Sequence, residues 1–344
     1  MTVVIKFGSA LVVDDDLRPR SDALAARARE IASLQSAGER ICIVSSGAIA
    51  LGLPLLGLRA RPRRMPRLQA ASAAGQPLLH VAWSEALAAA GLRAAQVLLT
   101  GDDIARRTSY VNVRNSLTAL LELGVVPVVN ENDATSTDEI AFGDNDTLAA
   151  HVAVLLHARL LVLLTEVEGV FTVPPGEAGA ELLADGRAAA EIRFGAGGAI
   201  GRGGMESKVR AAEIAAGAGV TTVIASGHGA AVLEPVASGE ARGTWFSASE
   251  SRPSAFKLWL RHGVRPAGRI AVDDGARRAL VEAGASLLAV GVTSVEGQFA
   301  RGEAVELVGP DGAVFARGIA TLAAHEIARE ARDEVVHRDR LALY

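Results

Sequence analysis

Two lysines in glycine-containing segments are the residues of this chain best suited to phosphoryl chemistry. Lys6 lies in the segment VVIKFGSA, and Lys208 ends the segment GRGGMESK, residues 201–208. Lys257 is the only other lysine, so nearly all of the 35 basic residues are arginines. A lysine ammonium is a compact charge that suits a moving phosphoryl group, whereas a guanidinium suits fixed bidentate pairing. The sequence therefore predicts that Lys6 and Lys208 face one ligand.

The glycines before Lys208 are typical of a loop whose backbone N–H groups surround an anion where a helix begins. The segment matches neither a Walker A loop nor the dinucleotide-binding G-x-G-x-x-G. By itself it fits a flexible surface loop equally well. Lys6 also has an alternative, an edge strand with its side chain in water. Because Gly8 and Ser9 follow directly and suit a turn into a phosphate site, the phosphate interpretation is favoured.

Two polar clusters follow strand-like segments, VVNENDAT at residues 128–135 and FGDNDTL at residues 142–148. Asp144 or Asp146 as a helix N-cap would account for one of these residues. The clusters hold more amides and carboxylates than capping requires: Asn130, Glu131, Asn132, Asp133, Asp144, Asn145 and Asp146. They predict a polar pocket that can hold an ammonium group.

No acid–base histidine, covalent nucleophile or zinc site is evident. The seven histidines include no pair with zincin spacing, and the single Cys42, within ICIV, fits a small buried hydrophobe. A carboxylate acceptor needs no base, because its pKa is about 4 and it is ionised at neutral pH. Transfer of a phosphoryl group to a carboxylate requires two anions held in line and their charges screened. Two lysines suit that task.

Alternating apolar strands and alanine-rich helices are expected to position these residues. The strand-like segments are VVIKFG, ICIVSSG, AAQVLLT, VVPVVNEND, LLVLLTE and TTVIASG, and helices are expected near 21–37, 70–90, 110–123, 145–157 and 206–217. This pattern predicts a parallel sheet with helices on both faces and ligands beyond the carboxyl ends of the strands. After about residue 247, short strands with turn signals such as Pro310-Asp311-Gly312 predict a small, mainly β domain.

Composition and charge narrow the class of protein. The 344 residues are 50% hydrophobic, which is ordinary for a soluble two-domain α/β enzyme. A net charge of −4 gives no electrostatic footprint for nucleic acid or an anionic membrane. Without a signal-peptide pattern or an uninterrupted apolar span, the sequence predicts a cytoplasmic protein with no membrane partner.

Over nearly its whole length the chain resembles the glutamate 5-kinases of the amino acid kinase superfamily. The resemblance is carried by KFGS, IVSSGAIALG, QVLLTGDD, YVNVRNSL, GVVPVVNENDA, FGDNDTLAA, LLVLLTEVEGVFT, GRGGMESK and VHRD. It implies an α/β amino acid kinase sandwich with a mainly parallel central sheet at 1–250, a linker at 251–265 and a small, mainly β PUA-like domain at 266–344. It also implies ATP and Mg²⁺ as cosubstrates and L-glutamate as acceptor, in the first step of proline biosynthesis.

The resemblance assigns roles to residues at matching positions. Lys6 and Lys208 would stabilise the transferring phosphoryl group, and Asp146 would hold both lysines. Ser46, Asp133 and Asn145 match glutamate-binding positions, and Asp133 suits the substrate ammonium. No metal ligand is assigned. The matching nucleotide-binding positions are Lys6, Gly8, Thr165, Glu166, Arg202, Gly203, Gly204, Met205, Glu206, Ser207 and Lys208.

Departures from the family pattern concentrate in the nucleotide half. Glu166 stands where the family has aspartate, FTVPP replaces a YTADP-like stretch, Arg202 replaces threonine and Glu206 replaces serine. Glu206 favours the helix dipole but repels phosphate. Nucleotide contacts are therefore less firmly predicted than glutamate contacts. The segment before VHRD is also shorter than usual, which predicts a trimmed PUA-like domain.

Three other interpretations agree less well with the sequence. Kinases of aspartate, acetylglutamate, carbamate and uridylate share the fold, but Ser9 stands where the aspartate and acetylglutamate kinases carry a second glycine. A catalytically inactive binder would have little need of Lys6, Asp146 and Lys208 together. RNA binding by residues 266–344 is disfavoured by nine arginines against twelve acidic residues. The resemblance further implies proline as a feedback inhibitor and a homo-oligomer.

Overall fold

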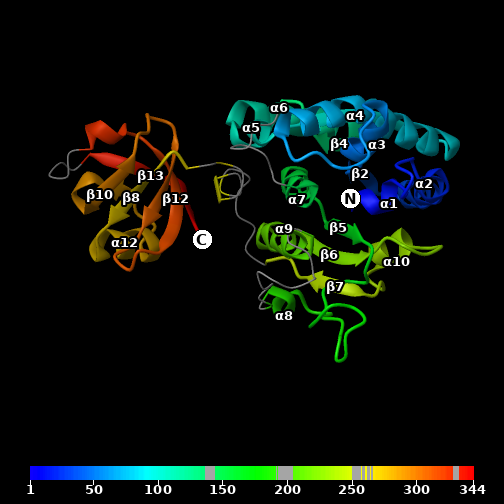
Figure 1. Cartoon of the computed structure of the whole chain (residues 1–344). Coiled ribbons are helices and arrows are strands. Elements are labelled where there is room, and N and C mark those ends of the chain that lie inside the picture. Colours follow the sequence, from blue (N-terminus) through cyan, green and yellow to red (C-terminus); the bar gives the residue numbers. More distant parts are fainter. Residues whose placement is uncertain are drawn as a thin grey trace. The chain divides into compact units, whose positions relative to one another are not determined.

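The chain folds into two units, drawn in Figure 1. The computed structural model describes residues 1–135, 144–190, 192, 204–249, 257, 260–261, 264, 266–327 and 333–344. One unit comprises Met1–Asp103 and Arg107–Arg252, and the other comprises Ile104–Arg106 and Pro253–Tyr344. The expected linker at 251–265 lies largely outside the described residues, so its limits stay a prediction.

Seven strands form the sheet of the first unit, in the order β3-β4-β2-β1-β5-β6-β7. All neighbours pair in parallel except β6 and β7, which are antiparallel. This confirms the predicted mainly parallel sheet and adds an edge strand that the sequence did not indicate. The strands are β1 (Thr2–Phe7), β2 (Arg40–Ser45), β3 (Arg93–Leu99), β4 (Val125–Glu131), β5 (Leu160–Thr165), β6 (Thr221–Ser226) and β7 (Gly243–Phe246).

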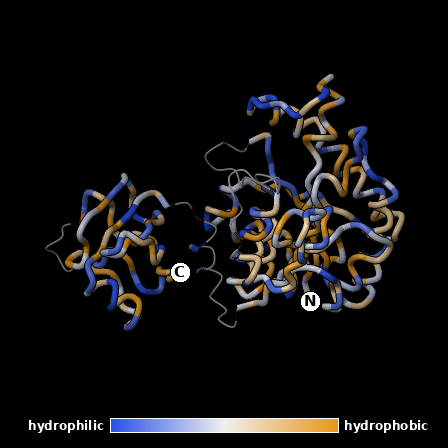
Figure 2. The backbone as a smooth tube through the Cα atoms, turned by 60° about the horizontal axis from the view of Figure 1, so that its bottom comes forward, coloured by the Kyte–Doolittle hydropathy of each residue, from blue (hydrophilic) through white to orange (hydrophobic). Residues whose placement is uncertain are grey.

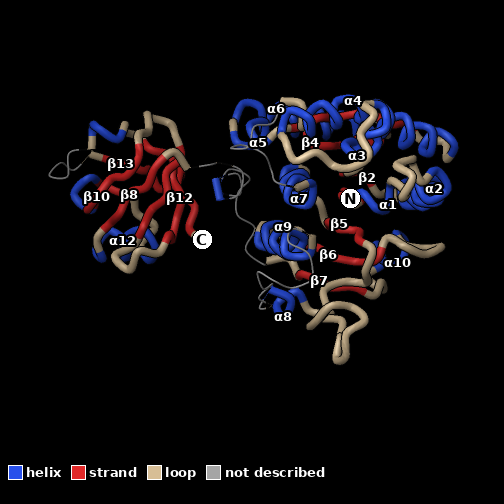
Figure 3. Tube along the Cα trace, in the orientation of Figure 1, coloured by secondary structure: helices blue, strands red, loops and turns tan. Residues whose placement is uncertain are grey.

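Helices connect these strands, as Figure 3 shows in blue between the red strands. All five helices expected from the sequence are present, with bounds that differ by a few residues. The helices are α1 (Ser9–Val12), α2 (Ser21–Ser36), α3 (Ala48–Leu55), α4 (Met65–Ala89), α5 (Gly101–Ala105), α6 (Arg107–Glu122), α7 (Asn145–Leu155), α8 (Gly186–Ala190), α9 (Met205–Gly217) and α10 (Leu233–Ser238).

The two faces of β1 have different surroundings, because successive side chains of a strand point to opposite faces. Val3, Ile5 and Phe7 belong to a buried apolar cluster that includes residues of α2 and α4, and the Phe7 ring lies 4.8 Å from that of Trp83. Figure 2 shows such hydrophobic segments gathered in the interior of this unit. Lys6 points to the opposite face, where α7 contacts β1. The alternation thus places one buried lysine beside α7.

The helices α3 and α4 pack backbone against backbone at two glycines. A Cβ atom on Gly52 would lie 1.8 Å from the Ala71 carbonyl oxygen, and one on Gly75 would lie 1.9 Å from the Ala48 carbonyl oxygen. No side chain fits in either place. The crossing therefore fixes α3, which begins directly after β2, relative to α4.

Gly52→Ala is accordingly expected to lower the free energy of unfolding by about 1–3 kcal/mol, because the new methyl group must push the two helices apart. Denaturant unfolding followed by circular dichroism measures the change. Gly217→Ala is the control, since Gly217 also lies in a helix but has open space where its Cβ would be. The control should be neutral or more stable by up to about 1 kcal/mol. Equal stability of the Gly52→Ala and wild-type proteins would contradict the close crossing.

The second unit is a six-stranded sheet in the order β10-β8-β11-β12-β13-β9, with its own apolar core. It is mainly β, as predicted. The predicted Pro-Asp-Gly turn joins β11 to β12, where Gly309 N donates to Ala313 O at 2.9 Å. Its elements are β8 (Gly268–Val272), α12 (Asp274–Glu282), β9 (Leu287–Leu288), β10 (Val292–Gly297), β11 (Ala304–Val308), β12 (Val314–Ala320) and β13 (Glu334–Leu343). Within the described ranges, every helix is too short or too polar to cross a lipid bilayer.

Candidate active site

One carboxylate lies between two lysines from different elements. Lys6 Nζ on β1 is 2.5 Å from Asp146 Oδ1, and Lys208 Nζ on α9 is 3.0 Å from Asp146 Oδ2. Lys208 also donates to the Gly204 carbonyl oxygen at 3.0 Å. The structure therefore brings together the three residues that the sequence analysis proposed as catalytic, although even Asp146 and Lys208 lie 62 positions apart along the chain.

All three side chains are buried, and their surroundings shift the pKa values of Lys6 and Asp146. Lys6 is 4% exposed, Asp146 3% and Lys208 8%. Burial lowers the pKa of the Lys6 ammonium; Asp146 opposes this and the charge of Lys208 adds to it, so the pKa stays below its usual value. Burial alone would raise the pKa of Asp146, but the charges of Lys6 and Lys208 and their hydrogen bonds bring it below its usual value. The lowered pKa of Asp146 favours its ionised form between the two lysines.

The neighbouring Asp144 has a structural role at the beginnings of two helices. It is the N-cap of α7, where its Oδ1 accepts a hydrogen bond from Thr147 N at 2.7 Å. Its Oδ2 accepts a hydrogen bond from the Ser207 hydroxyl on α9. Asp144 thus joins the beginnings of α7 and α9, and this leaves Asp146, two residues further on, for the lysines.

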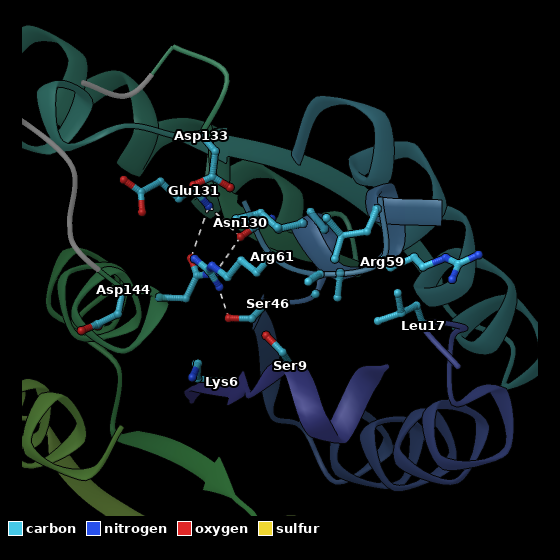
Figure 4. Close-up of a pocket in the computed structure, with 17 residues that line it drawn as sticks. Lys6, Ser9, Leu17, Ser46, Arg59, Arg61, Asn130, Glu131, Asp133 and Asp144 are labelled. Carbon is cyan, nitrogen blue, oxygen red and sulfur yellow. Dashed lines mark hydrogen bonds between the residues drawn. The ribbon is translucent and has the colours of Figure 1, made fainter. Parts of the chain in front are cut away.

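Asn145 links the two polar clusters predicted from the sequence. Its Nδ2 donates to Ser46 Oγ at 2.8 Å and to Asn130 Oδ1 at 2.9 Å, and its Oδ1 accepts from Glu131 N at 3.3 Å. Asn130 Nδ2 in turn donates to Gln76 Oε1 on α4 at 2.7 Å. These bonds hold the end of β4, the end of β2 and the beginning of α7 in one arrangement, as the dashed lines in Figure 4 indicate in part.

A cavity of about 490 Å³ opens beside this network (Figure 4). Its wall includes Gly47–Ala50, the first turn of α3, whose backbone N–H groups favour an anion. Gly47 has a φ of +123°, a conformation that suits glycine, and a Cβ there would lie 3.1 Å from Val13. The charged and polar side chains in the wall are those of Lys6, Ser9, Ser46, Arg59, Arg61, Asn130, Glu131, Asp133, Asp144 and Asn145.

The predicted substrate residues Ser46, Asp133 and Asn145 all line this cavity. Asp133 Oδ2 accepts a hydrogen bond from Ser72 Oγ on α4 at 2.6 Å, which orients the carboxylate. Sequence reasoning missed the supporting residues Ser72 and Gln76, because nothing in the pattern of a helix marks the two positions that meet the end of β4 and the turn after it. It also missed Arg59 and Arg61.

The predicted nucleotide residues are only partly described. Gly8 follows β1, Thr165 ends β5, and Thr165 O accepts from Gly227 N at 2.8 Å after β6, so these segments meet at the carboxyl edge of the sheet. Gly204, Met205, Glu206 and Ser207 form the N-cap and first turn of α9, with Glu206 exposed. Glu166 directly follows β5. Arg202 and Gly203 lie outside the described residues.

The carboxylates of Asp144 and Asp146 are engaged by other groups and do not fit a resident metal ion. Both oxygens of Asp146 contact lysines, and both oxygens of Asp144 accept hydrogen bonds. No group of three or more histidine, cysteine, aspartate or glutamate side chains suited to a metal is found in the described part of the chain. Cys42 is buried, and burial raises the pKa of its thiol.

Comparisons with known proteins agree with this geometry. Residues 1–226 match the amino acid kinase family, and residues 268–341 match the PUA domain. A glutamate 5-kinase of Acinetobacter baumannii (strain SDF) is 44% identical over 99% of this chain and 96% of its own length. A glutamate 5-kinase of Chromobacterium violaceum is 46% identical over 94% of this chain and 88% of its own. An X-ray structure of isopentenyl phosphate kinase shares the fold, with a TM-score of 0.53 and 22% identity over 71% of this chain and 99% of that one.

Proposed function

Because the chain belongs to the amino acid kinase family and carries a PUA domain, we propose that it transfers the γ-phosphoryl group of ATP to the γ-carboxylate of L-glutamate, the first step of proline biosynthesis. The observation that carries this proposal is the Lys6–Asp146–Lys208 group, of which Lys6 lines the acceptor cavity. Two ammonium groups around one carboxylate leave a net positive charge where a phosphoryl group would pass. Such fixed charge stabilises the transition state of phosphoryl transfer without covalent chemistry.

The acceptor is held by groups of matching charge. Its γ-carboxylate lies beside Lys6 and the first turn of α3, and its ammonium group lies beside Asp133. Ser46 follows β2, the strand that pairs with β1 next to Lys6, so its hydroxyl and neighbouring amides serve the same carboxylate. Asn145 keeps Ser46 in place through the hydrogen bond described above. The γ-carboxylate is already ionised at neutral pH, so no residue has to remove a proton from it.

ATP approaches from the beginning of α9. Gly204 to Lys208 place the helix N-terminus and one ammonium toward its phosphates, and Gly8, Thr165 and Glu166 contribute from the edge of the sheet. Arg202 and Gly203 belong to the same proposed nucleotide site. Mg²⁺ enters with ATP, since this ion commonly binds substrate phosphates with few protein carboxylates.

Family membership also supports three wider proposals: a cytoplasmic location, a homo-oligomer and feedback inhibition by proline. Residues 1–250 would act as the kinase domain and residues 266–344 as the PUA domain, joined by the linker at 251–265. RNA binding by the PUA domain stays disfavoured by the excess of acidic residues noted above.

The proposed reaction is tested by ATP turnover of the purified protein with Mg²⁺, using hydroxylamine to trap an acyl phosphate as a hydroxamate. The acceptors are L-glutamate, L-aspartate, N-acetylglutamate and none. Hydroxamate that forms only with L-glutamate is the expected result. Turnover with another acid alone would overturn the proposed acceptor, and hydrolysis of ATP without any acceptor dependence would overturn the proposed transfer.

Asp133→Ala is expected to raise the KM for L-glutamate by about 10- to 100-fold, because the substrate ammonium loses a charge-assisted hydrogen bond. The expected change in kcat is smaller, since the ammonium is remote from the transferring group. Steady-state kinetics measure both. Ser72→Ala is the matched variant: it keeps the carboxylate but removes the bond that orients it, so its KM should rise by less than about tenfold. An unchanged KM in Asp133→Ala would reject this role.

A further inference from the structure

We propose that Arg61 binds the α-carboxylate of the acceptor and so selects an amino acid that carries two carboxylates. The inference deepens the proposed function and rests on it. Arg61 lies in the segment that joins α3 to α4, and its side chain lines the acceptor cavity. No pattern in the sequence singled it out among so many arginines.

The charges in the cavity wall require a further cation. Glu131, Asp133 and Asp144 contribute three carboxylates to the wall. Lys6 is one of the cations there, but it lies 2.5 Å from the buried Asp146. An acceptor with two carboxylates and one ammonium has a net charge of −1, and a wall dominated by carboxylates would repel it. The other cations that line the cavity are Arg59 and Arg61.

The two arginines differ in direction. Both are exposed, and neither has a hydrogen bond or ion pair with any other residue in the described part of the chain. Figure 4 shows Arg61 extending toward the group that contains Ser46 and Asn130, whereas Arg59 extends away from it. Only Arg61 is therefore oriented to reach a bound acceptor.

The order of the charged groups along the substrate determines which of its two carboxylates Arg61 can bind. Lys6 marks the end where the γ-carboxylate meets the phosphoryl group. The α-carboxylate and the ammonium group are attached to the same carbon atom. The partner of the α-carboxylate must therefore lie on the same part of the wall as Asp133, away from Lys6. A guanidinium there can hold the carboxylate through two parallel hydrogen bonds. Exposure of Arg61 without the substrate then allows the acceptor to enter before the side chain closes on it.

Arg61→Gln is expected to raise the KM for L-glutamate by about 10- to 100-fold, with kcat changed by less than about threefold. Arg59→Gln is the matched control, because Arg59 lies in the same segment, is also exposed and loses the same charge. The KM for L-glutamate is expected to change by less than about threefold in this variant. Arg61→Lys should recover part of the affinity, because the charge is restored without the fork. Thermal unfolding checks that all three variants are folded.

A second acceptor separates a specific contact from general attraction. γ-Aminobutyrate keeps the reacting carboxylate and the ammonium but lacks the α-carboxylate. In the wild-type protein it should require a much higher concentration than L-glutamate, and Arg61→Gln should not raise its KM further. The same fold increase for both acceptors, equal effects of Arg59→Gln and Arg61→Gln, or an unchanged KM for L-glutamate would each overturn the inference. The proposed function fails separately, if the wild-type protein forms no glutamate-dependent hydroxamate.

Discussion

Replacing Lys208 by alanine should lower kcat by about 10²–10³-fold or more, the usual cost of removing a fixed group that stabilises transition-state charge. Affinity for L-glutamate should stay within about threefold, because Lys208 lies on the far side of Asp146 from Lys6 and does not line the acceptor cavity. The cation is needed most when charge moves between the two substrates. The substitution should therefore lower kcat and leave the KM nearly unchanged.

The hydroxamate assay gives kcat, and isothermal titration with L-glutamate in the absence of ATP gives the affinity. Arg210→Ala is the control, since Arg210 is an exposed cation two residues further along α9. It should retain near wild-type turnover. Parallel losses of glutamate affinity and turnover in Lys208→Ala would contradict a role confined to the transfer step.

Asp146→Asn should damage both stability and catalysis, because the substitution leaves two buried ammonium groups without their carboxylate. Removing one partner of a buried ion pair typically costs about 3–5 kcal/mol. The folded-state pKa of Asp146 lies below its ordinary value of 3.8, so its stabilising contribution is fully present above that pH and is lost as the pH falls further. The difference in unfolding free energy between wild type and Asp146→Asn should therefore be constant near neutral pH and shrink below about pH 4.

Asp146→Asn should also shift the alkaline limit of activity. Burial holds the pKa of Lys6 below its ordinary value of 10.5, and the Asp146 carboxylate is the main group that opposes this shift. Without the carboxylate, Lys6 should lose its proton at lower pH, so any residual activity should decline earlier as the pH rises. A pH–rate profile measures this. Asp22→Asn, an exposed acid in the first turn of α2, is the control and should change stability by less than about 0.5 kcal/mol. An unshifted alkaline limit would show that Asp146 does not maintain the charge of Lys6.

Much of the kinase fold could be predicted because its signals are local. The runs around β1, β4 and β5 are apolar enough for buried parallel strands, and each ends in polar residues where ligands are expected. The structure adds the helices α1, α3, α5, α8 and α10 and the strand β7, which the sequence did not indicate. Gly52 and Pro54 weaken the helical pattern of α3, and β7 has only four residues.

Only some residues of the site could be predicted from the sequence, and the reasons are physical. Either Asp144 or Asp146 could have capped α7, and the choice depends on the residue at which the helix begins, which patterns place only within a residue or two. The partners of Asn130 and Asp133 lie on α4, and these contacts join residues more than fifty positions apart. The sequence did not distinguish Arg61 from the many other arginines, because the direction of its side chain depends on the conformation of the segment between α3 and α4.

The crossing of α3 and α4 at Gly52 and Gly75 has a consequence for how such an enzyme could acquire a longer or shorter acceptor. With backbone in contact, neither helix can slide to lengthen the cavity. A change of acceptor length would therefore come most readily from new side chains in the segment between the helices, at residues 56–64. Engineering of acceptor choice should begin in this short segment, because substitutions at the crossing of the helices lower stability.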